Sequence, residues 1–228
     1  MKYNIIPIIL GNNCNDTNLL YGSVNDAILI YNLFYTFYLK NTTWKKPYIF
    51  LNINVKLQNI INFIKKCNSQ ETINYNIFLI YFSGHSDKNG NLQFHQESVS
   101  SNTILKEINK IFFNTEVFFI IDSCFSSNFI SSNIFNNINK IRYLVSCDKN
   151  QKSKEIVINY DDNMFKNMPI ENKKPKIVIG IFTFYLYKSL KNRNITDINY
   201  WGNIINDNIW FMIEKIHGQK IYYHFLEH

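Results

Sequence analysis

Two short apolar runs near the middle of the chain most constrain its fold. Ile77–Tyr81 and Val117–Ile121 are continuously apolar and do not alternate between apolar and polar residues. A strand with water on one face alternates, whereas a strand covered on both faces reads as an unbroken apolar run. The two runs therefore predict the centre of a mostly parallel sheet with helices packed against both of its faces.

Other apolar runs alternate with segments of helical spacing, in which apolar residues recur every three or four positions. This alternation predicts an α/β fold, a three-layer α/β/α sandwich. We expect strands at Tyr3–Leu10, Tyr48–Ile53, Tyr75–Phe82, Glu116–Ile121, Ile141–Ser146 and Lys220–Phe225. We expect helices at Val24–Tyr38, Leu57–Ile64, Ile104–Phe112 (capped by Ser101 or Asn102), Gly180–Leu190 and Ile204–Ile216.

The 228 residues fit one domain that spans 1–228. We divide it into a large segment, about 1–150, a polar loop over 151–176 and a small segment over 177–228. The loop holds several lysines and two prolines, and reads as a substrate-gating or self-cleaved segment or, equally, as a surface insertion.

Charge and composition exclude several classes of function. The net charge is +7, but the lysines occur as scattered pairs such as Lys45-Lys46, so we expect no nucleic-acid partner. No segment has the roughly 20 apolar residues that span a bilayer, so we expect no membrane partner. The four cysteines are widely spaced and no secretory signal is visible, which favours reduced thiols and a cytoplasmic location. No cysteine or histidine pair has metal-ligand spacing, so we expect no metal site.

Chemistry is expected where the buried strands end, because ligands of open α/β sheets bind beyond the carboxyl ends of the strands. One strand runs into Ser83-Gly84-His85-Ser86 and another into Asp122-Ser123-Cys124. If the strands are neighbours, His85 and Cys124 form a catalytic dyad in which the imidazole activates the thiol and later protonates a leaving amine. The backbone N–H groups of Ser86 and Cys124 are candidates for stabilising an oxyanion.

Each residue alone has a plainer explanation. A single cysteine at a strand end is commonly a small buried apolar residue, and a single histidine a hydrogen-bonded surface residue. If both are incidental, the chain is a flavodoxin-like binding domain, for which Gly11 after the first strand is the one weak hint of a phosphate loop.

Five segments, in the expected order, resemble the sequence motifs of metacaspases, a group of caspase-like cysteine peptidases. The resemblance covers nearly the whole chain. The segments are Gly22–Ala27 (first helix), Tyr81–His85 (histidine motif), Ile120–Ser126 (cysteine motif), Ser146-Cys147 with Gln151, Ser153 and Glu155 (substrate loop), and Gly180–Phe184 (helix of the small segment).

The resemblance implies an endopeptidase that cleaves after Arg or Lys and acts as a monomer on protein or peptide substrates. It also implies an acidic substrate pocket, whose positions correspond to Ser23, Asp26, Ser83 and Asp122. Two of these have competing explanations. Ser23 and Asp26 also read as a helix capping box, and Asp122 also reads as an acceptor for backbone N–H groups after its strand.

Some positions depart from the metacaspase pattern. Ser86 follows the histidine where glycine is common, Phe125 and Ser127 follow the cysteine in place of His and Gly, and Ser23 stands where a second cysteine is frequent. These departures leave open a catalytically weak protein that acts by binding. Asp87–Gly90 reads as a turn and Glu97 is the one acid in the stretch from there to Ser101, so we expect no calcium-activation loop.

Overall fold

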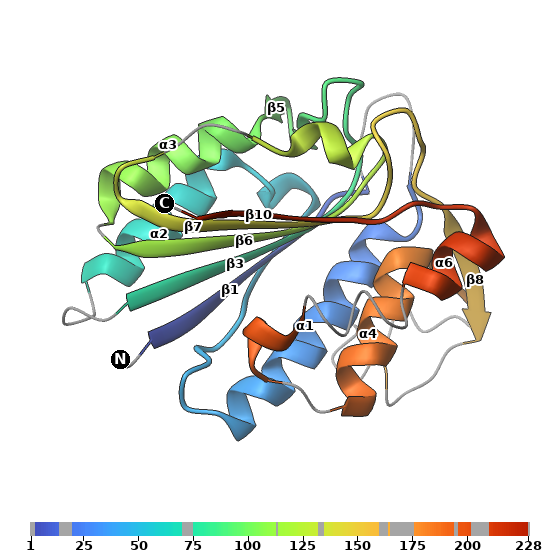
Figure 1. The fold of residues 1–228 in the computed structure, drawn as a ribbon, viewed down its shortest axis with the longest axis horizontal. Helices are drawn as coiled ribbons and strands as arrows, with labels where there is room; N and C mark the ends of the chain where they lie inside the picture. Colours follow the sequence, from blue (N-terminus) through green and yellow to red (C-terminus); the bar gives the residue numbers. More distant parts are fainter. Residues whose placement is uncertain are drawn as a thin grey trace.

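A six-stranded sheet runs through the centre of the molecule in the order β10-β7-β6-β3-β1-β2 (Figure 1). This computed structural model describes residues 3–13, 20–69, 75–112, 114–131, 135–159, 164, 176–193, 196–201 and 210–227. All neighbouring strands of the sheet are parallel except β10, which pairs antiparallel with β7. The strands are β1 (Tyr3–Gly11), β2 (Tyr48–Leu51), β3 (Tyr75–Ser83), β6 (Thr115–Asp122), β7 (Ile138–Val145) and β10 (Tyr222–Glu227).

Helices cover both faces of the sheet, which confirms the predicted α/β sandwich. Figure 1 shows α2 and α3 on one face and α1 and α4 on the other. Apolar side chains alternate between the two layers, because Ile5 and Ile9 of β1 join the core under α1 whereas Ile6 and Ile8 join the core under α2. The helices are α1 (Ser23–Lys40), α2 (Leu57–Ser69), α3 (Ser101–Ile111), α4 (Ile181–Arg193) and α6 (Trp210–His217), with short 3-10 turns at Asn52–Asn54, Ser126–Phe129 and Ile198–Tyr200.

The two apolar runs form neighbouring strands at the centre of this sheet, as predicted. Every residue of β6 is buried, and in β3 only Tyr75 is not. The two strands pair in parallel from Asn76↔Thr115 to Ser83↔Asp122. Their carboxyl ends therefore meet at one rim of the sheet.

The main difference from the sequence prediction lies after β7. The predicted loop over 151–176 contains a strand, β8 (Glu155–Asn159), which pairs antiparallel with β9 (Lys176–Gly180). Helical spacing correctly predicted α4 but gave no sign of β9 before it. Much of the loop, residues 160–163 and 165–175, lies outside the described residues, as does the start of the helix predicted over Ile204–Ile216.

Smaller differences concern turns and helix ends. A hairpin of β4 (Leu92–Phe94) and β5 (Glu97–Val99) follows the histidine motif and was not predicted. The cap of α3 is Ser100, not Ser101 or Asn102, because the Ser100 hydroxyl accepts a hydrogen bond from the backbone N–H of Thr103. No helix in the described ranges combines the length and the apolar character needed to cross a membrane.

Candidate active site

The sheet brings His85 and Cys124 to the same rim. Ser83 of β3 pairs with Asp122 of β6, so each candidate catalytic residue lies two positions beyond a paired strand end. The two loops are joined where they leave the sheet. The N–H of Gly84 donates to the carbonyl of Asp122 over 3.2 Å, and the Ser86 hydroxyl donates to the carbonyl of Cys124.

Gly84 is required by how tightly the chain turns before His85. A Cβ atom at this position would lie 2.5 Å from the ring of Phe82 and 3.2 Å from the carbonyl oxygen of Asn12. Backbone packed this closely excludes any side chain, so His85 follows a fixed turn.

Cys124 is partly buried, and burial raises the pKa of its thiol above the ordinary value. The backbone N–H of Ser153 donates to the sulfur and Lys152 lies near it, and both effects lower this pKa without cancelling the effect of burial. The resting group is therefore a thiol that needs a base. The next residue, Phe125, has a φ of 53°, an uncommon conformation for a bulky side chain and one that accumulates at functional sites.

The candidate base, His85, lies on the loop that follows the neighbouring strand β3. His85 is partly buried. Burial raises the pKa of Glu155. The nearby charge of His85 acts in the opposite direction and offsets part of this rise. His85 thus has an acidic side chain, Glu155, within electrostatic range.

Two buried carboxylates form the base of the site. Asp26 of α1 accepts hydrogen bonds from the Ser83 hydroxyl, 2.7 Å, and from the N–H of Gly180, 2.8 Å. Asp122 accepts from the Ser153 hydroxyl at 2.6 Å and from the Thr183 hydroxyl and N–H at 2.7 and 3.2 Å. The site thus joins α1, the two central strands, the segment before β8 and the start of α4.

The surroundings of both carboxyl groups disfavour the ionised form and raise the pKa of each group. Burial and the neighbouring charge of Asp122 raise the pKa of Asp26 well above its ordinary value. Burial also raises the pKa of Asp122, although its hydrogen bonds act in the opposite direction. Neither carboxylate forms an ion pair with any residue that the structure describes. Among the described residues, this acidic pair therefore has no cation partner.

Gly180, between β9 and α4, lies against both carboxylates. A Cβ atom there would come within 2.3 Å of Oδ2 of Asp122 and 2.9 Å of Oδ2 of Asp26. The absence of a side chain therefore keeps the space between the two acids open.

A small cavity of about 30 Å³ opens onto these groups. Its lining includes all four residues predicted for substrate binding, together with Cys124. His85 and Ser86 lie just beyond Gly84 and are not part of the lining. The lining residues are Leu20, Ser23, Asp26, Ser83, Gly84, Asp122, Ser123, Cys124, Ser153, Lys154, Glu155 and Gly180.

The structure also decides between the explanations of the two acids. The capping box at Ser23 and Asp26 is wrong, because Gly22 caps α1 without a side-chain bond and the Asp26 carboxylate turns to Ser83 and Gly180. The acceptor explanation of Asp122 is correct in part, since one of its three bonds comes from a backbone N–H.

Sequence reasoning placed Ser153 and Glu155 in a substrate loop without giving them partners. Ser153 bonds to Asp122, and Glu155 accepts from the N–H of Gly22, 2.9 Å, at the start of α1. Gln151 fixes the same loop, because its amide donates to Gly218 and accepts from Lys220. The resemblance of this segment to the metacaspase substrate loop was the available signal.

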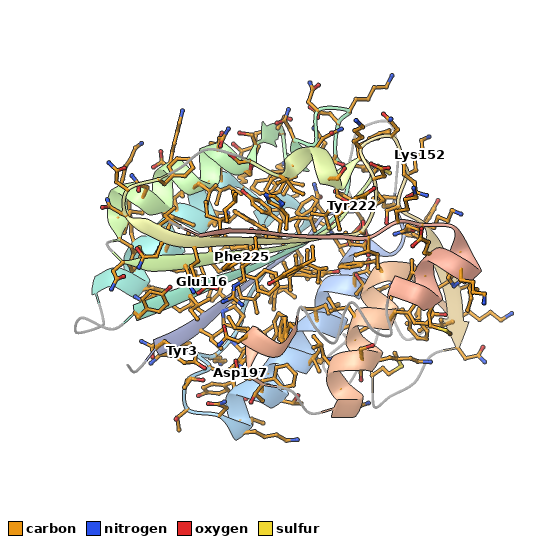
Figure 2. The ribbon with its side chains drawn as sticks, viewed as in Figure 1. Tyr3, Glu116, Lys152, Asp197, Tyr222 and Phe225 are labelled. Atoms are coloured by element: carbon orange, nitrogen blue, oxygen red, sulfur yellow. The ribbon has the colours of Figure 1, made fainter. Side chains whose placement is uncertain are left out.

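The loop lies over the carboxyl end of the sheet. Figure 2 shows Lys152 at that end, away from Tyr3 at the amino end of β1. The neighbouring Cys147 is buried, and its thiol donates to the carbonyls of Ser123 and Gln151, each over 3.1 Å. Cys147 therefore links this loop to the segment that carries Cys124.

The backbone donors proposed for an oxyanion stay a prediction. The bridge between Ser86 and Leu92 uses the N–H groups of Asp87 and Gln93, so the Ser86 N–H is not part of that ladder. Asp87–Gly90 forms the expected turn, with Asp87 accepting from the N–H groups of Asn89 and Asn91. Within the described part of the chain, no cluster of three or more acidic, histidine or cysteine residues is arranged to hold a metal.

Comparison with known proteins agrees with this architecture. The family model described as "Caspase domain" matches residues 6–196. A crystal structure of a protein from Geobacter sulfurreducens is similar over 97% of this chain and 93% of its own, with a TM-score of 0.64 and 12% identity, which supports the fold alone. No curated protein matches the sequence. Since the family model covers most of the chain, this protein belongs to the caspase-domain family.

Proposed function

We propose that this protein is a cysteine endopeptidase that cleaves peptide bonds after Arg or Lys, as metacaspases do. One observation carries the proposal: two buried carboxylates with no cation partner in the described residues line the same cavity as Cys124. A buried charge is costly unless it is paired. A guanidinium or ammonium group of the substrate would supply the missing charge.

The reaction would proceed in two stages. His85 takes the Cys124 proton as the sulfur attacks the carbonyl carbon of the basic residue itself, and the N–H groups of Ser86 and Cys124 stabilise the oxyanion. The imidazolium then gives its proton to the leaving amine, which departs and leaves a thioester. Water, deprotonated by His85, hydrolyses the thioester and regenerates the thiol.

Substrate binding requires the site to open. The cavity of about 30 Å³ is too small for a lysine or arginine side chain. Ser153 hydrogen-bonds to Asp122 across one side of it, and Glu155 anchors the same segment to Gly22. We expect the segment from Gln151 to Glu155 to shift outward so that the substrate cation replaces the Ser153 hydroxyl at Asp122.

The test is a set of fluorogenic peptides that differ only in the residue before the reporter: Arg, Lys, citrulline or Asp. Citrulline keeps the shape of arginine and removes its charge. We expect turnover of the Arg and Lys peptides, a loss of about 100-fold with citrulline and no turnover with Asp. Cys124→Ala and His85→Ala should each abolish turnover, whereas the buried Cys147→Ser should retain it.

Equal turnover of Arg and citrulline peptides would contradict the acidic pocket. Turnover that persists in Cys124→Ala would contradict the dyad. Addition of EGTA should leave the rate unchanged, because we propose no calcium requirement.

A second candidate is a protein of the same fold that binds basic peptides without cleaving them. The raised pKa of Cys124 and the small cavity favour it. In that case an Arg peptide would bind the wild type and Cys124→Ala equally in fluorescence anisotropy, with no product in either sample.

A further inference from the structure

A much larger hollow lies at the outer edge of the sheet. It has a volume of about 820 Å³ and opens between β2, the last strand, and α2. None of its lining residues belongs to the candidate active site. The lining residues are Lys46, Pro47, Tyr48, Ile49, Phe50, Asn54, Asn59, Asn62, Phe63, Lys66 and Cys67. We call this hollow the β2–α2 groove.

One wall of the groove is the main chain of β2. Residues 47–50 line it consecutively, although side chains of a strand point alternately to opposite faces. Consecutive lining therefore means that the edge of the strand faces the groove. β2 pairs with β1 on its other side and ends the sheet, so among the described strands none covers this edge. A bare strand edge offers N–H and C=O groups to another extended chain.

The opposite wall is one face of α2. Asn59, Asn62, Phe63, Lys66 and Cys67 recur at the spacing of a single helical face. This wall presents amides and one aromatic ring. An edge strand facing a helix is the geometry in which domains bind peptides by adding a strand.

Aromatic rings lie between the two walls. Tyr48 is 47% exposed, and its ring stacks on Phe63 with 4.4 Å between the centroids. Phe50 lies 5.0 Å from Tyr48 on the same wall. An exposed aromatic pair beside a strand edge offers apolar surface to a side chain of a bound segment.

Among the described residues that line the groove, the charge has one sign. Two of them, Lys46 and Lys66, are lysines and none is acidic. The sequence from Ala27 to Gln70 contains six lysines and no Asp or Glu. A second copy of this positively charged chain is a poor match for such a surface, whereas a segment rich in carboxylates is a good one.

We propose that the β2–α2 groove binds an extended, acidic segment of a protein partner, which adds to β2 as a further strand and sets an apolar side chain against Tyr48 and Phe63. Register connects the groove with the rim of the sheet. Gly11 pairs with Leu51 at the end of β2 and with Ser83 at the end of β3. A segment bound along β2 therefore continues toward the side of the molecule that carries Cys124, and a substrate held there gains a second attachment.

The test uses a fluorescein-labelled heptapeptide, Glu-Glu-Phe-Val-Phe-Glu-Glu, in fluorescence anisotropy with the full chain. It contains no Arg or Lys, so binding does not depend on the proposed peptidase specificity. We expect saturable binding that weakens at least several-fold between low and 0.5 M salt, because exposed charges are screened. A peptide of the same sequence with alternate N-methyl groups cannot pair with a strand edge and should not bind.

Three variants and one control variant locate the site. Lys46→Glu and Lys66→Glu should each weaken binding about five-fold or more, roughly 1 kcal/mol, whereas Lys106→Glu on α3 makes the same charge change outside the groove and should leave it unaltered. Tyr48→Ser should also weaken binding, and circular dichroism checks that each variant is folded.

The proposal is overturned if the acidic peptide does not bind, if the N-methylated peptide binds equally, or if binding survives both lysine changes. Self-association lost in Lys46→Glu would assign the groove to a second copy and overturn it as well. Because the assay detects binding only, a loss of peptidase activity in Cys124→Ala with unchanged anisotropy separates the two proposals.

Discussion

Two acids at opposite ends of the same strand, β6, occur in contrasting environments. Glu116, near the amino end, is buried and lies 2.5 Å from Nε of the buried Arg142. Asp122, at the carboxyl end, is equally buried, but its close charged neighbour is a second acid, Asp26. One end of the strand carries a neutralised pair and the other a concentration of negative charge.

The difference is the one expected between a structural charge and the substrate-binding charge that we propose. Arg142 also donates to Asn199 over 2.9 Å, and its guanidinium lies 5.6 Å from the ring centre of Phe225, so the cation is held by several contacts. Figure 2 shows Glu116 and Phe225 on the part of the sheet away from Lys152. The Asp26–Asp122 pair has hydroxyl and N–H donors in place of a cation. Such a site is stabilised fully only when a positive ligand enters it.

Of the changes considered, removal of the Arg142 cation near the amino end of β6 should have the largest energetic effect. Arg142→Met leaves Glu116 buried without its partner, and we expect the free energy of unfolding to fall by about 3–5 kcal/mol. Urea denaturation followed by circular dichroism measures it. The double variant Glu116→Gln with Arg142→Met should recover part of the loss, because no uncompensated charge remains. A single variant as stable as wild type would remove the distinction between the two ends.

Neutralising the functional end should affect activity first. Asp122→Asn keeps the shape of the side chain and halves the charge of the pair, so we expect kcat/KM for an Arg peptide to fall about 100-fold, near 2.7 kcal/mol. The fluorogenic assay measures it. Glu107→Gln, which breaks the exposed pair with Lys110, is the matched control and should leave the rate unchanged. Equal activity of both variants would show that Asp122 does not bind the substrate cation.

The buried apolar runs and the strand-end rule predicted the central strands from the sequence, but not the pairing of Glu116 with Arg142. Ile77–Tyr81 and Val117–Ile121 predicted buried strands, and His85 and Cys124 share one rim because these strands, β3 and β6, are neighbours. The acidic pair was expected only from the resemblance to metacaspases. The sequence prediction missed β8 and β9, although each carries an Ile-Val-Ile run, because runs of three apolar residues in a polar stretch are too short to define a periodicity. Nor could local spacing reveal that Gly180, far along the chain from Asp26, donates a hydrogen bond to it, since this contact exists only through tertiary packing.

Filling the space between the two acids is a gentler change. The methyl group of Gly180→Ala would meet Oδ2 of Asp122 and push it from Asp26. We expect a loss of roughly 1–3 kcal/mol in stability from overpacking. At 20 °C we also expect kcat/KM of the variant for an Arg peptide to fall by more than the fraction of unfolded protein explains. An unchanged KM and kcat in this variant would mean that the substrate cation does not enter between the carboxylates.

The smallest expected effect is on how stability depends on pH. Burial raises the pKa of Asp26 in the folded protein above the value of 3.8 for a free side chain. The folded state therefore binds a proton more tightly than the unfolded state, and the stability this gives is fully present below 3.8 and is lost as pH rises through the folded pKa. Asp26→Asn lacks this titration. Its amide can still accept from Gly180 and donate to the hydroxyl oxygen of Ser83, so we expect the variant to match the wild type in acid and to exceed it by about 1 kcal/mol or more at neutral pH. Urea unfolding at a series of pH values from 4 to 8 measures the difference. Parallel curves for the two proteins would mean that the charge of Asp26 is already compensated. The acids at both ends of β6 would then be neutralised by their surroundings.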